Sequence, residues 1–553
     1  MNRFTSCVRL AFMALTLTTA TSSQLVPPDA TVANATSSFA GGFKQHFGFT
    51  VDSGADWDGD GLEDLVAGGV TPNLVGQAEV RVIYHVGTTP LEFKVTGITS
   101  KVWGVPAALV RDLNGHGKAD LVIGVPEWTH TPGDPDQADI GQFVVFYGEN
   151  WSDVPGTQTI RGGDVVIKGL YPHRRVGFSV SDAGDVDGDG FHDLLVGAPG
   201  CDPLDLPMGS CSLAPLTYKG RTYLFLGGPN GMAALDPYQG LQPPAGPALG
   251  ASGLPMATGP ATPGFTMLNP DAIAVMLEGQ SGRDHFGFDV ESVGDLNGDG
   301  KSEFAVGAIQ AYRSCCLTFT ALTDASSNEL PGYVDVFKHG LTAPIAHITP
   351  DLSQTPDMVA AVFGASISTV GDLNIDLVPE LVIGAPGTYK TVGGMRAFTH
   401  GAVFGYSGAG VFLGAPGAHM FSSLNLFEPN AQGLKELGPD AGFGLSVAGS
   451  LVSFAGPVLP DLPDLAVGAW NTYDVDGAVF VLTPDFASGE VVVQKRIAGD
   501  PNHHTRFGTA TVLGRIYSST IPAIISGAWG QALPGSVNEE GFVHVFNYGL
   551  VFP

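Results

Sequence analysis

The sequence predicts an all-β fold, specifically a seven-bladed β-propeller built from four-stranded blades. Three observations support this prediction: a unit that recurs seven times, short apolar runs bounded by turn residues, and a chain of 553 residues with 77 glycines and 40 prolines. Glycine is present at about twice its usual share, which is typical of many short strands joined by turns. A chain of this length is either several domains or one repeat architecture, and the repeat favours the second.

Each repeat unit starts with an aromatic or apolar residue followed by glycine, passes through an acidic loop, and continues into an apolar run and a further strand. The starts lie near residues 47, 103, 176, 286, 363, 443 and 507. Apolar runs such as 194–199 are typical of strands buried on both faces. A weaker fourth strand precedes the next start, as at 272–277 and 491–496. Four-stranded units arranged radially bury faces that a lone sheet would expose.

The seventh unit lacks room for its own fourth strand, because only residues 547–553 follow its third strand. We therefore expect the segment 25–40 to pair into blade seven and close the ring, which protects the sheet edges. The predicted propeller accordingly spans residues 25–553.

The N-terminus predicts a signal peptide over residues 1–20. Arg3 and Arg9 precede an apolar stretch from Leu10 to Leu17, and small residues lead to Ala20; this order is typical of secretory signals. A membrane anchor is the alternative, but the apolar run is shorter than the ~20 residues of a spanning helix. We expect a secreted, extracellular protein without a membrane span in the mature chain.

Four cysteines remain after removal of the signal: Cys201, Cys211, Cys315 and Cys316. Four cysteines allow three pairings. A disulfide bond between Cys201 and Cys211 is preferred because it closes a short loop, while the arrangement of the adjacent pair stays open. Two sequons, at Asn34 and Asn150, predict a glycoprotein if the chain is secreted.

Five loops between the first and second strands carry polar side chains at positions one, three, five and nine, and these are the candidate metal ligands. They are Asp56, Asp58, Asp60 and Asp64; Asp112, Asn114, His116 and Asp120; Asp185, Asp187, Asp189 and Asp193; Asp295, Asn297, Asp299 and Glu303; and Asp372, Asn374, Asp376 and Glu380. Alternating side chains around a tight loop converge, and a backbone carbonyl at position seven completes an oxygen cage suited to Ca²⁺. Glycine at position six, as at Gly61, permits the sharp turn.

The five loops do not predict calcium equally. Ile375 and Leu377 replace the usual glycines in the fifth loop, and His116 places a nitrogen in the second, so these two loops are weaker candidates. The loops of units six and seven, 449–464 and 513–523, depart from the pattern and predict no calcium. We expect about three to five structural Ca²⁺ ions per chain.

Two other interpretations of the acidic loops were weighed. An EF-hand requires a bidentate Glu at position twelve and flanking helices, whereas Ala67, Gly197 and Val306 occupy or lie near that position and apolar strands follow. Simple turns rich in Asp and Gly are the remaining alternative. Repetition in register with the strands favours calcium binding.

Phe-Gly at the unit start and Gly-Ala-Pro after the second strand, as in Phe286-Gly287 and Gly197-Ala198-Pro199, resemble the FG-GAP repeat family. The chain resembles the N-terminal β-propeller of integrin α subunits over nearly all of its length after residue 40. This resemblance implies extracellular recognition or cell adhesion through a protein partner. The chain departs from a whole integrin α subunit because it has no leg domains, spanning helix or inserted adhesion domain.

The net charge of −29 argues against nucleic acid as a partner, since phosphate binding needs a clustered basic surface. No GxSxG or HExxH motif is present, and the glycines from Gly408 to Gly414 lack a βαβ context, so no catalytic or cofactor-binding residues are predicted and the chain is not expected to be an enzyme.

The long loops between second and third strands lie together on the face opposite the acidic loops, and they form the expected recognition surface. Long loops that the fold tolerates without a binding role are the alternative. Trp128, Tyr312 and Tyr389 are its candidate contacts. A lectin-like, glycan-binding propeller is the alternative function. It predicts aromatic platforms repeated blade by blade, which the loops do not show.

Overall fold

The computed structural model describes the chain in segments. They are residues 30–41, 46–69, 78–98, 104–129, 139–169, 173–200, 219–229, 231–232, 267–268, 275–282, 284–310, 331–352, 358–374, 376–392, 395–398, 400–414, 419–423, 441–449, 465–470, 477–485, 489–500, 505–517, 522–530 and 540–547. The predicted signal peptide, the four cysteines and Tyr312 lie outside these residues. Among the described residues, no helix has both the length and the apolar character needed to cross a bilayer.

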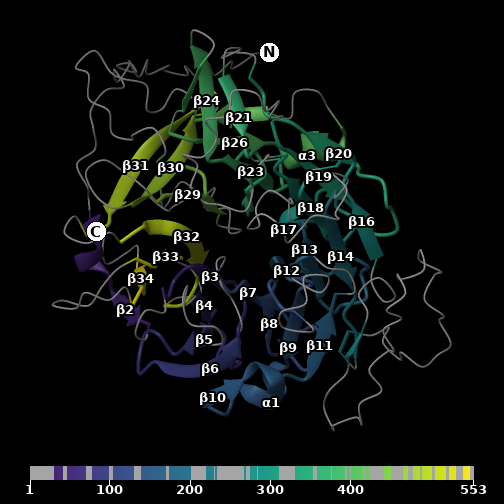
Figure 1. Ribbon diagram of the computed structural model, residues 1–553, viewed down its shortest axis with the longest axis vertical. Helices are drawn as coiled ribbons and strands as arrows, with labels where there is room; N and C mark the ends of the chain where they lie inside the picture. Colours follow the sequence, from purple (N-terminus) through teal and green to yellow (C-terminus); the bar gives the residue numbers. More distant parts are fainter. Residues whose placement is uncertain are drawn as a thin grey trace, which may run out of the picture.

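Seven antiparallel sheets follow one another around a ring, which confirms the all-β, seven-bladed propeller (Figure 1). In blades one to three the strands, from the innermost outward, are β3 (Thr50–Ser53), β4 (Leu65–Gly69), β5 (Ala78–Tyr84) and β6 (Leu91–Ile98); β7 (Ala107–Val110), β8 (Asp120–Val125), β9 (Gln142–Phe146) and β11 (Val165–Lys168); and β12 (Ser179–Gly184), β13 (Asp193–Ala198), β14 (Arg221–Phe225) and β16 (Val275–Glu278).

Blades four to six follow the same order. Their strands are β17 (Phe286–Gly294), β18 (Glu303–Ala308), β19 (Tyr333–Phe337) and β20 (Ala346–Ile348); β22 (Ser366–Val370), β23 (Glu380–Ala385), β26 (Ala402–Tyr406) and β27 (His419–Ser422); and β28 (Ser446–Gly449), β29 (Leu465–Ala469), β30 (Ala478–Asp485) and β31 (Glu490–Ala498).

Blade seven is built from both ends of the chain. Its inner strands are β32 (Phe507–Gly514), β33 (Ala523–Ala528) and β34 (Phe542–Asn547), and its outer strand is β2 (Ser37–Ala40), which pairs antiparallel with β34. The strand β1 (Ala30–Thr31) pairs in parallel with β31 of blade six, and η1 (Val32–Asn34) joins it to β2. The N-terminal segment therefore lies across two blades.

Several short elements extend this plan. Outer parallel strands β10 (Gly156–Thr159) and β15 (Met267–Leu268) extend blades one and two, and α1 (Gly148–Trp151) and η3 (Ile160–Gly162) lie near β10 in the chain. Gly408 and Gly410, two of the glycines that lack a βαβ context, lie in a short helix, α3 (Gly408–Phe412), which the Ser407 hydroxyl caps.

One long connection differs from the sequence-based expectation of a loop. Residues 386–401 contain β24 (Gly387–Val392) and β25 (Met395–Phe398), which form a hairpin and pair with β21 (Met358–Ala361). Gly393-Gly394 separates the two strands in the sequence, and a two-residue Gly-Gly connection is typical of a hairpin.

The recurring glycines have a steric cause at the junctions between blades. The unit-start glycines, such as Gly177 and Gly444, have φ of 85° and 87°, a region where a side chain is strained. A Cβ added to the second-strand Gly384 would lie 2.0 Å from the Gly444 carbonyl oxygen of the next blade, and one added to Gly124 would lie 2.0 Å from that of Gly177. Neighbouring blades thus touch backbone to backbone.

Apolar side chains fill the remaining space between adjacent blades. Between blades two and three, Val122 and Phe143 pack in one cluster with Val196 and Phe225, and the two phenylalanine rings meet edge to face at 5.1 Å between centroids. The core therefore consists of layers between blades, and the loops at the strand ends extend from a rigid ring.

Replacing Gly384 with alanine is expected to lower stability by about 1–3 kcal/mol, because the added methyl group overpacks against backbone that has little room to move. Thermal unfolding measures this loss. Gly162→Ala is the matched control, since its added Cβ would have only Gln158 within 4 Å, at 3.8 Å. Equal melting temperatures for the two variants would contradict the backbone contact.

Candidate metal centres

The acidic loops connect the first and second strands of their blades, and neighbouring loops are joined by backbone hydrogen bonds. The Ala119 amide donates to the Asp56 carbonyl at 2.8 Å, and the Ser302 amide donates to the Asp185 carbonyl at 2.8 Å. In both pairs, position eight of one loop binds position one of the loop before it. These bonds join the first loop to the second and the third loop to the fourth.

The third loop shows how the backbone arranges the carboxylates. Asp185 accepts hydrogen bonds from the amides of Gly188 at 2.6 Å, Asp189 at 3.1 Å and Gly190 at 2.9 Å. Gly188 and Gly190 have φ of 80° and 94°, so the tight turn depends on glycine. The first and fourth loops repeat these contacts around Asp56 and Asp295.

The position-nine carboxylates anchor the loops to the blades. Asp64, Asp193, Glu303 and Glu380 are at most 2% exposed, and each accepts the position-two amide of its own loop, at 2.8 Å in the first, third and fourth loops and at 2.5 Å in the fifth. Burial, with a smaller effect of the other loop carboxylates, raises the pKa of Asp64 to about 8 and that of each of the other three to about 7. A nearby cation would favour their ionised forms.

Predicted ligand atoms converge in three of the loops. Carboxylate oxygens within 4.8 Å of one another come from Asp56, Asp58 and Asp64; from Asp185, Asp187 and Asp193; and from Asp372, Asp376 and Glu380. In the fourth loop, the Asn297 amide donates to Glu303, while Asp295 binds the loop backbone. In the fifth loop, Leu377 has φ of 70° at the position that is glycine elsewhere, and it is 89% exposed.

The second loop is arranged differently. The Asn114 amide donates to Glu149 of α1 at 2.6 Å, and His116 Nδ1 lies 3.6 Å from the same carboxylate. The buried Asp120 accepts the amides of Leu113 and Gly148, both at 2.9 Å. Two of the four predicted ligands therefore lie against Glu149, which the sequence analysis did not identify because it comes from a later helix.

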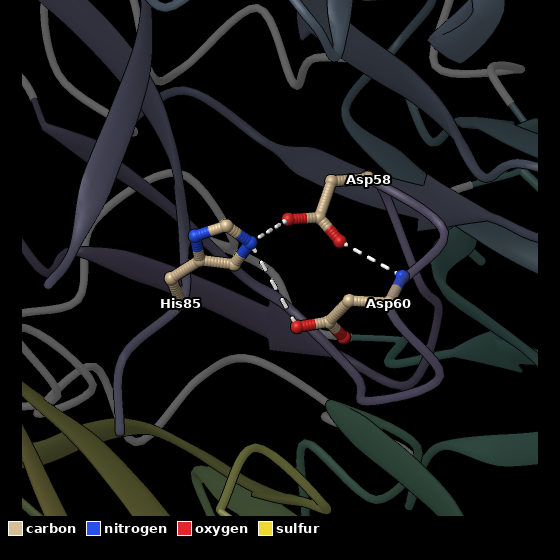
Figure 2. Close-up of side chains that lie close together, drawn as sticks. All are labelled: Asp58, Asp60 and His85. Atoms are coloured by element: carbon tan, nitrogen blue, oxygen red, sulfur yellow. Dashed lines mark hydrogen bonds and ion pairs between the residues drawn. The ribbon is translucent and has the colours of Figure 1, made fainter. Parts of the chain in front are cut away.

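The first loop has an additional neighbour that sequence spacing did not reveal. His85, directly after β5, places Nε2 2.7 Å from Asp58 Oδ2 and 3.8 Å from Asp60 Oδ2 (Figure 2). In the propeller topology, the third strand of a blade ends near the acidic loop of that blade. A histidine directly after the third strand is therefore the sequence signal that would have identified His85 as a neighbour of the loop.

In blade seven, the residue directly after the first strand is basic, whereas in the acidic loops the position-one residue is an aspartate. Arg515, directly after β32, donates from Nε to Glu63 Oε1 at 2.8 Å and from its backbone amide to Glu63 Oε2 at 2.7 Å. Glu63 is position eight of the first loop. The junction between blades seven and one is thus joined by an internal ion pair.

A second group of acidic side chains lies on the innermost strands. Asp52 accepts the Leu109 amide at 3.0 Å, Asp289 accepts the Ile367 amide at 2.7 Å, and Glu291 accepts the Ser181 hydroxyl at 3.0 Å. Burial raises the pKa of Asp52 and Asp289 to about 7, and burial together with Asp289 and Asp52 raises that of Glu291 well above its ordinary value. These carboxylates link adjacent blades around the axis.

Of the predicted recognition residues, Trp128 and Tyr389 are among the described residues. Trp128 is half-buried, with Lys168 Nζ 4.5 Å from its ring centroid. Tyr389 lies on β24, in the small additional sheet. The two residues belong to connections from the second to the third strands of blades two and five.

Comparison with known proteins supports the family resemblance. Residues 178–225 match the FG-GAP repeat, covering β12 to β14 of blade three. Integrin alpha-PS2 of Drosophila melanogaster is 29% identical over 196 residues, which cover 34% of this chain and 12% of that protein. Integrin alpha-5 of Xenopus laevis is 25% identical over 198 residues, 36% of this chain and 16% of that protein.

The relatives also include an enzyme. Phosphatidylinositol-glycan-specific phospholipase D of Mus musculus is 30% identical over 126 residues, which cover 23% of this chain and 13% of the enzyme. The chain thus spans less than a fifth of the length of these relatives. The solved structure of Saccharomyces cerevisiae Sqt1 aligns with 93% of this chain and 98% of its own at 10% identity, with a TM-score of 0.41.

The inner carboxylates predict a pH dependence of stability. A folded-state pKa of about 7 for Asp289 exceeds its value of 3.8 in the unfolded chain. Folding therefore favours the protonated form, and this stabilising contribution is complete below about pH 4 and is lost as pH rises through about 7. We expect Asp289→Asn to reduce the fall in melting temperature between about pH 5 and about pH 8, measured in excess calcium.

Asp153→Asn is the control for this pH series, because the Asp153 side chain is 80% exposed. It should retain the wild-type slope. A slope unchanged in Asp289→Asn would show that this carboxylate ionises in the folded chain as it does in solvent.

Proposed function

We propose that this chain is a secreted, calcium-binding β-propeller that recognises an extracellular protein partner. The observation that carries the proposal is the repetition of acidic loops in register on successive blades, each with a buried position-nine carboxylate. The integrin relatives support adhesion or recognition as the general role. In this proposal, the role of the bound calcium is structural: it keeps the acidic loops in a fixed conformation.

Calcium supplies a physical reason for the acidic loops. In the first and third loops, three carboxylates place oxygens within 4.8 Å of one another, and such a group is unfavourable when fully ionised. Ca²⁺ takes six to eight oxygen ligands from carboxylates, backbone carbonyls and water. The proposed ions are held in loops one, three, four and five, with weaker binding in the second loop, where Asn114 and His116 contact Glu149.

Recognition is proposed for the face opposite the acidic loops. The long connections 126–141 and 386–401 belong to this face, and the second of them forms the hairpin β24–β25. Loops and hairpins on a rigid scaffold are common sites of binding. The conformation of the ring is fixed by backbone contacts, so this surface is held in place before any partner arrives.

We propose a binding role rather than catalysis for this chain. The phospholipase D relative matches over 13% of its own length. The sequence carries no nucleophile elbow or zinc-protease motif. A lectin-like role is the second candidate, and a glycan array with hits that depend on calcium would favour it over a protein partner.

Secretion would allow glycosylation, and the surroundings of the two sequons differ in the structure. Asn34 and Thr36 are exposed next to β2. Asn150 in α1 is exposed as well, but its Nδ2, the atom that carries a glycan, donates to Asp164 at 3.1 Å. Ser152 of the same sequon is buried and accepts a hydrogen bond from Lys118. We therefore propose Asn34 as the glycosylated residue.

Calcium binding is tested by thermal unfolding and metal counting on the purified mature chain. Chelation should lower the melting temperature, since an ion at 100 times its dissociation constant adds about 2.7 kcal/mol to stability. Asp185→Asn should reduce the count by one ion from the expected about three to five. Asp153→Asn is the control and should retain the full count. A chain without bound calcium and without a chelator effect would refute the proposal.

Secretion and glycosylation are tested in a secreting eukaryotic host. Asn34→Gln should lower the mass of the secreted protein by one glycan, because the exposed sequon is accessible to the transferase. Asn150→Gln should leave the mass unchanged apart from the substitution itself. A glycan on Asn150 alone would contradict the assignment.

A further inference from the structure

His85 distinguishes the first acidic loop from the others. Its imidazole lies against two loop carboxylates, with Nε2 2.7 Å from Asp58 and 3.8 Å from Asp60 (Figure 2). Its backbone has φ of 56°, which is uncommon for a residue other than glycine. These three side chains are the one group in the described part of the chain that combines imidazole nitrogen with carboxylate oxygens around a possible ion.

Strand register identifies the equivalent residues in other blades. In blade one, Leu65 is the first residue after the loop, and it pairs with Ile83, two residues before His85. In blade four the corresponding residue Phe304 pairs with Phe337, so the equivalent of His85 is His339. His339 is exposed. In blades two and three the position is Gly148 and Gly227, whose amides donate to the position-nine carboxylates. Blade one thus presents a side-chain nitrogen where blades two and three present a backbone amide.

The surroundings of His85 contain a buried polar group that the loop itself does not satisfy. Tyr84 is 2% exposed, and its hydroxyl has no hydrogen-bond partner among the described residues. The Tyr84 ring centroid lies 5.5 Å from that of His85, so the phenol is a direct neighbour of the imidazole. Buried polar atoms in proteins are normally paired, and a bound ion with its water would provide the missing partner.

We propose that Asp58, Asp60 and His85 form a mixed nitrogen and oxygen site for a first-row transition-metal ion such as Zn²⁺. Imidazole and carboxylate together suit zinc, whereas Ca²⁺ prefers oxygen ligands. Donors at about 2.0–2.2 Å around a tetrahedral zinc ion lie about 3.3–3.5 Å apart, and the two observed donor distances of 2.7 and 3.8 Å bracket that value.

This site is accessible and shares ligands with a proposed calcium site. The His85 side chain is 38% exposed, while that of Asp58 is 8% exposed, so solvent reaches the ion position from the histidine side and leaves room for a water ligand. Zinc and calcium compete for Asp58 and Asp60 in the first loop. The inference goes beyond recognition and does not depend on calcium in the other loops.

The test uses the full mature chain, stripped of metal by a chelator and then dialysed against Zn²⁺ in excess Ca²⁺. Counting both metals should give one zinc ion per wild-type chain. His85→Asn, in which asparagine tolerates the left-handed backbone, should weaken zinc binding about tenfold or more, because loss of even an outer-shell partner of a metal ligand has an effect of about that size. His339→Asn is the matched control and should bind zinc like the wild type.

Cobalt(II) provides a second measurement on the unaltered chain. Its visible absorption should show nitrogen and oxygen coordination in the wild type, with the signal displaced by zinc. Absence of zinc from the wild-type chain, or equal zinc binding in both histidine variants, would overturn the inference. The calcium count of the same samples is read separately, so failure of the calcium proposal and failure of the zinc site give different results.

Discussion

Contact between backbones of adjacent blades is the constraint on which the rest of this structure depends. Each second strand carries a glycine that faces the next blade, and a Cβ at Gly197, Gly307 or Gly468 would meet the carbonyl oxygen of the following unit-start glycine at 1.9–2.2 Å. Hydroxyl groups strengthen the same junctions, since Ser179 donates to the Gly287 carbonyl at 3.1 Å and Ser366 to the Gly444 carbonyl at 2.9 Å. The two glycines of the repeat motif are therefore partners in space, although they come from different units.

The acidic loops add charge to a scaffold that is already close-packed. Their position-nine carboxylates are buried in the blades, and their other carboxylates accept hydrogen bonds from backbone amides of the turn. The side chains that fix the loop conformation are therefore the same ones that form the cluster of negative charge. The inner carboxylates follow a related principle, because Asp52 and Asp289 each bind the backbone of a neighbouring blade. Negative charge is thus used structurally on both the loop face and the axis.

The sequence predicted the number of blades, their starts and the loop positions, because these depend on short local patterns: a glycine pair, an apolar run and an alternating acidic loop. It did not predict the hairpin β24–β25, although Gly393-Gly394 is a local signal for it. It also missed the additional outer strands β10 and β15, whose pairing partners are distant in the chain. The candidate metal site shows the same difference between local patterns and contacts that are distant in the chain. Loop ligands were identified by spacing, whereas His85 and Glu149 reach the loops from other elements and required the topology.

The ion pair between Arg515 and Glu63 has a consequence for how the ring responds to its environment. It lies at the junction between the blade that contains both chain ends and the first acidic loop. The charge that balances Glu63 is a guanidinium carried by the chain itself, so this junction does not need a bound ion to neutralise that carboxylate. Opening the ring at this junction would therefore separate two opposite charges as well as the paired strands β2 and β34.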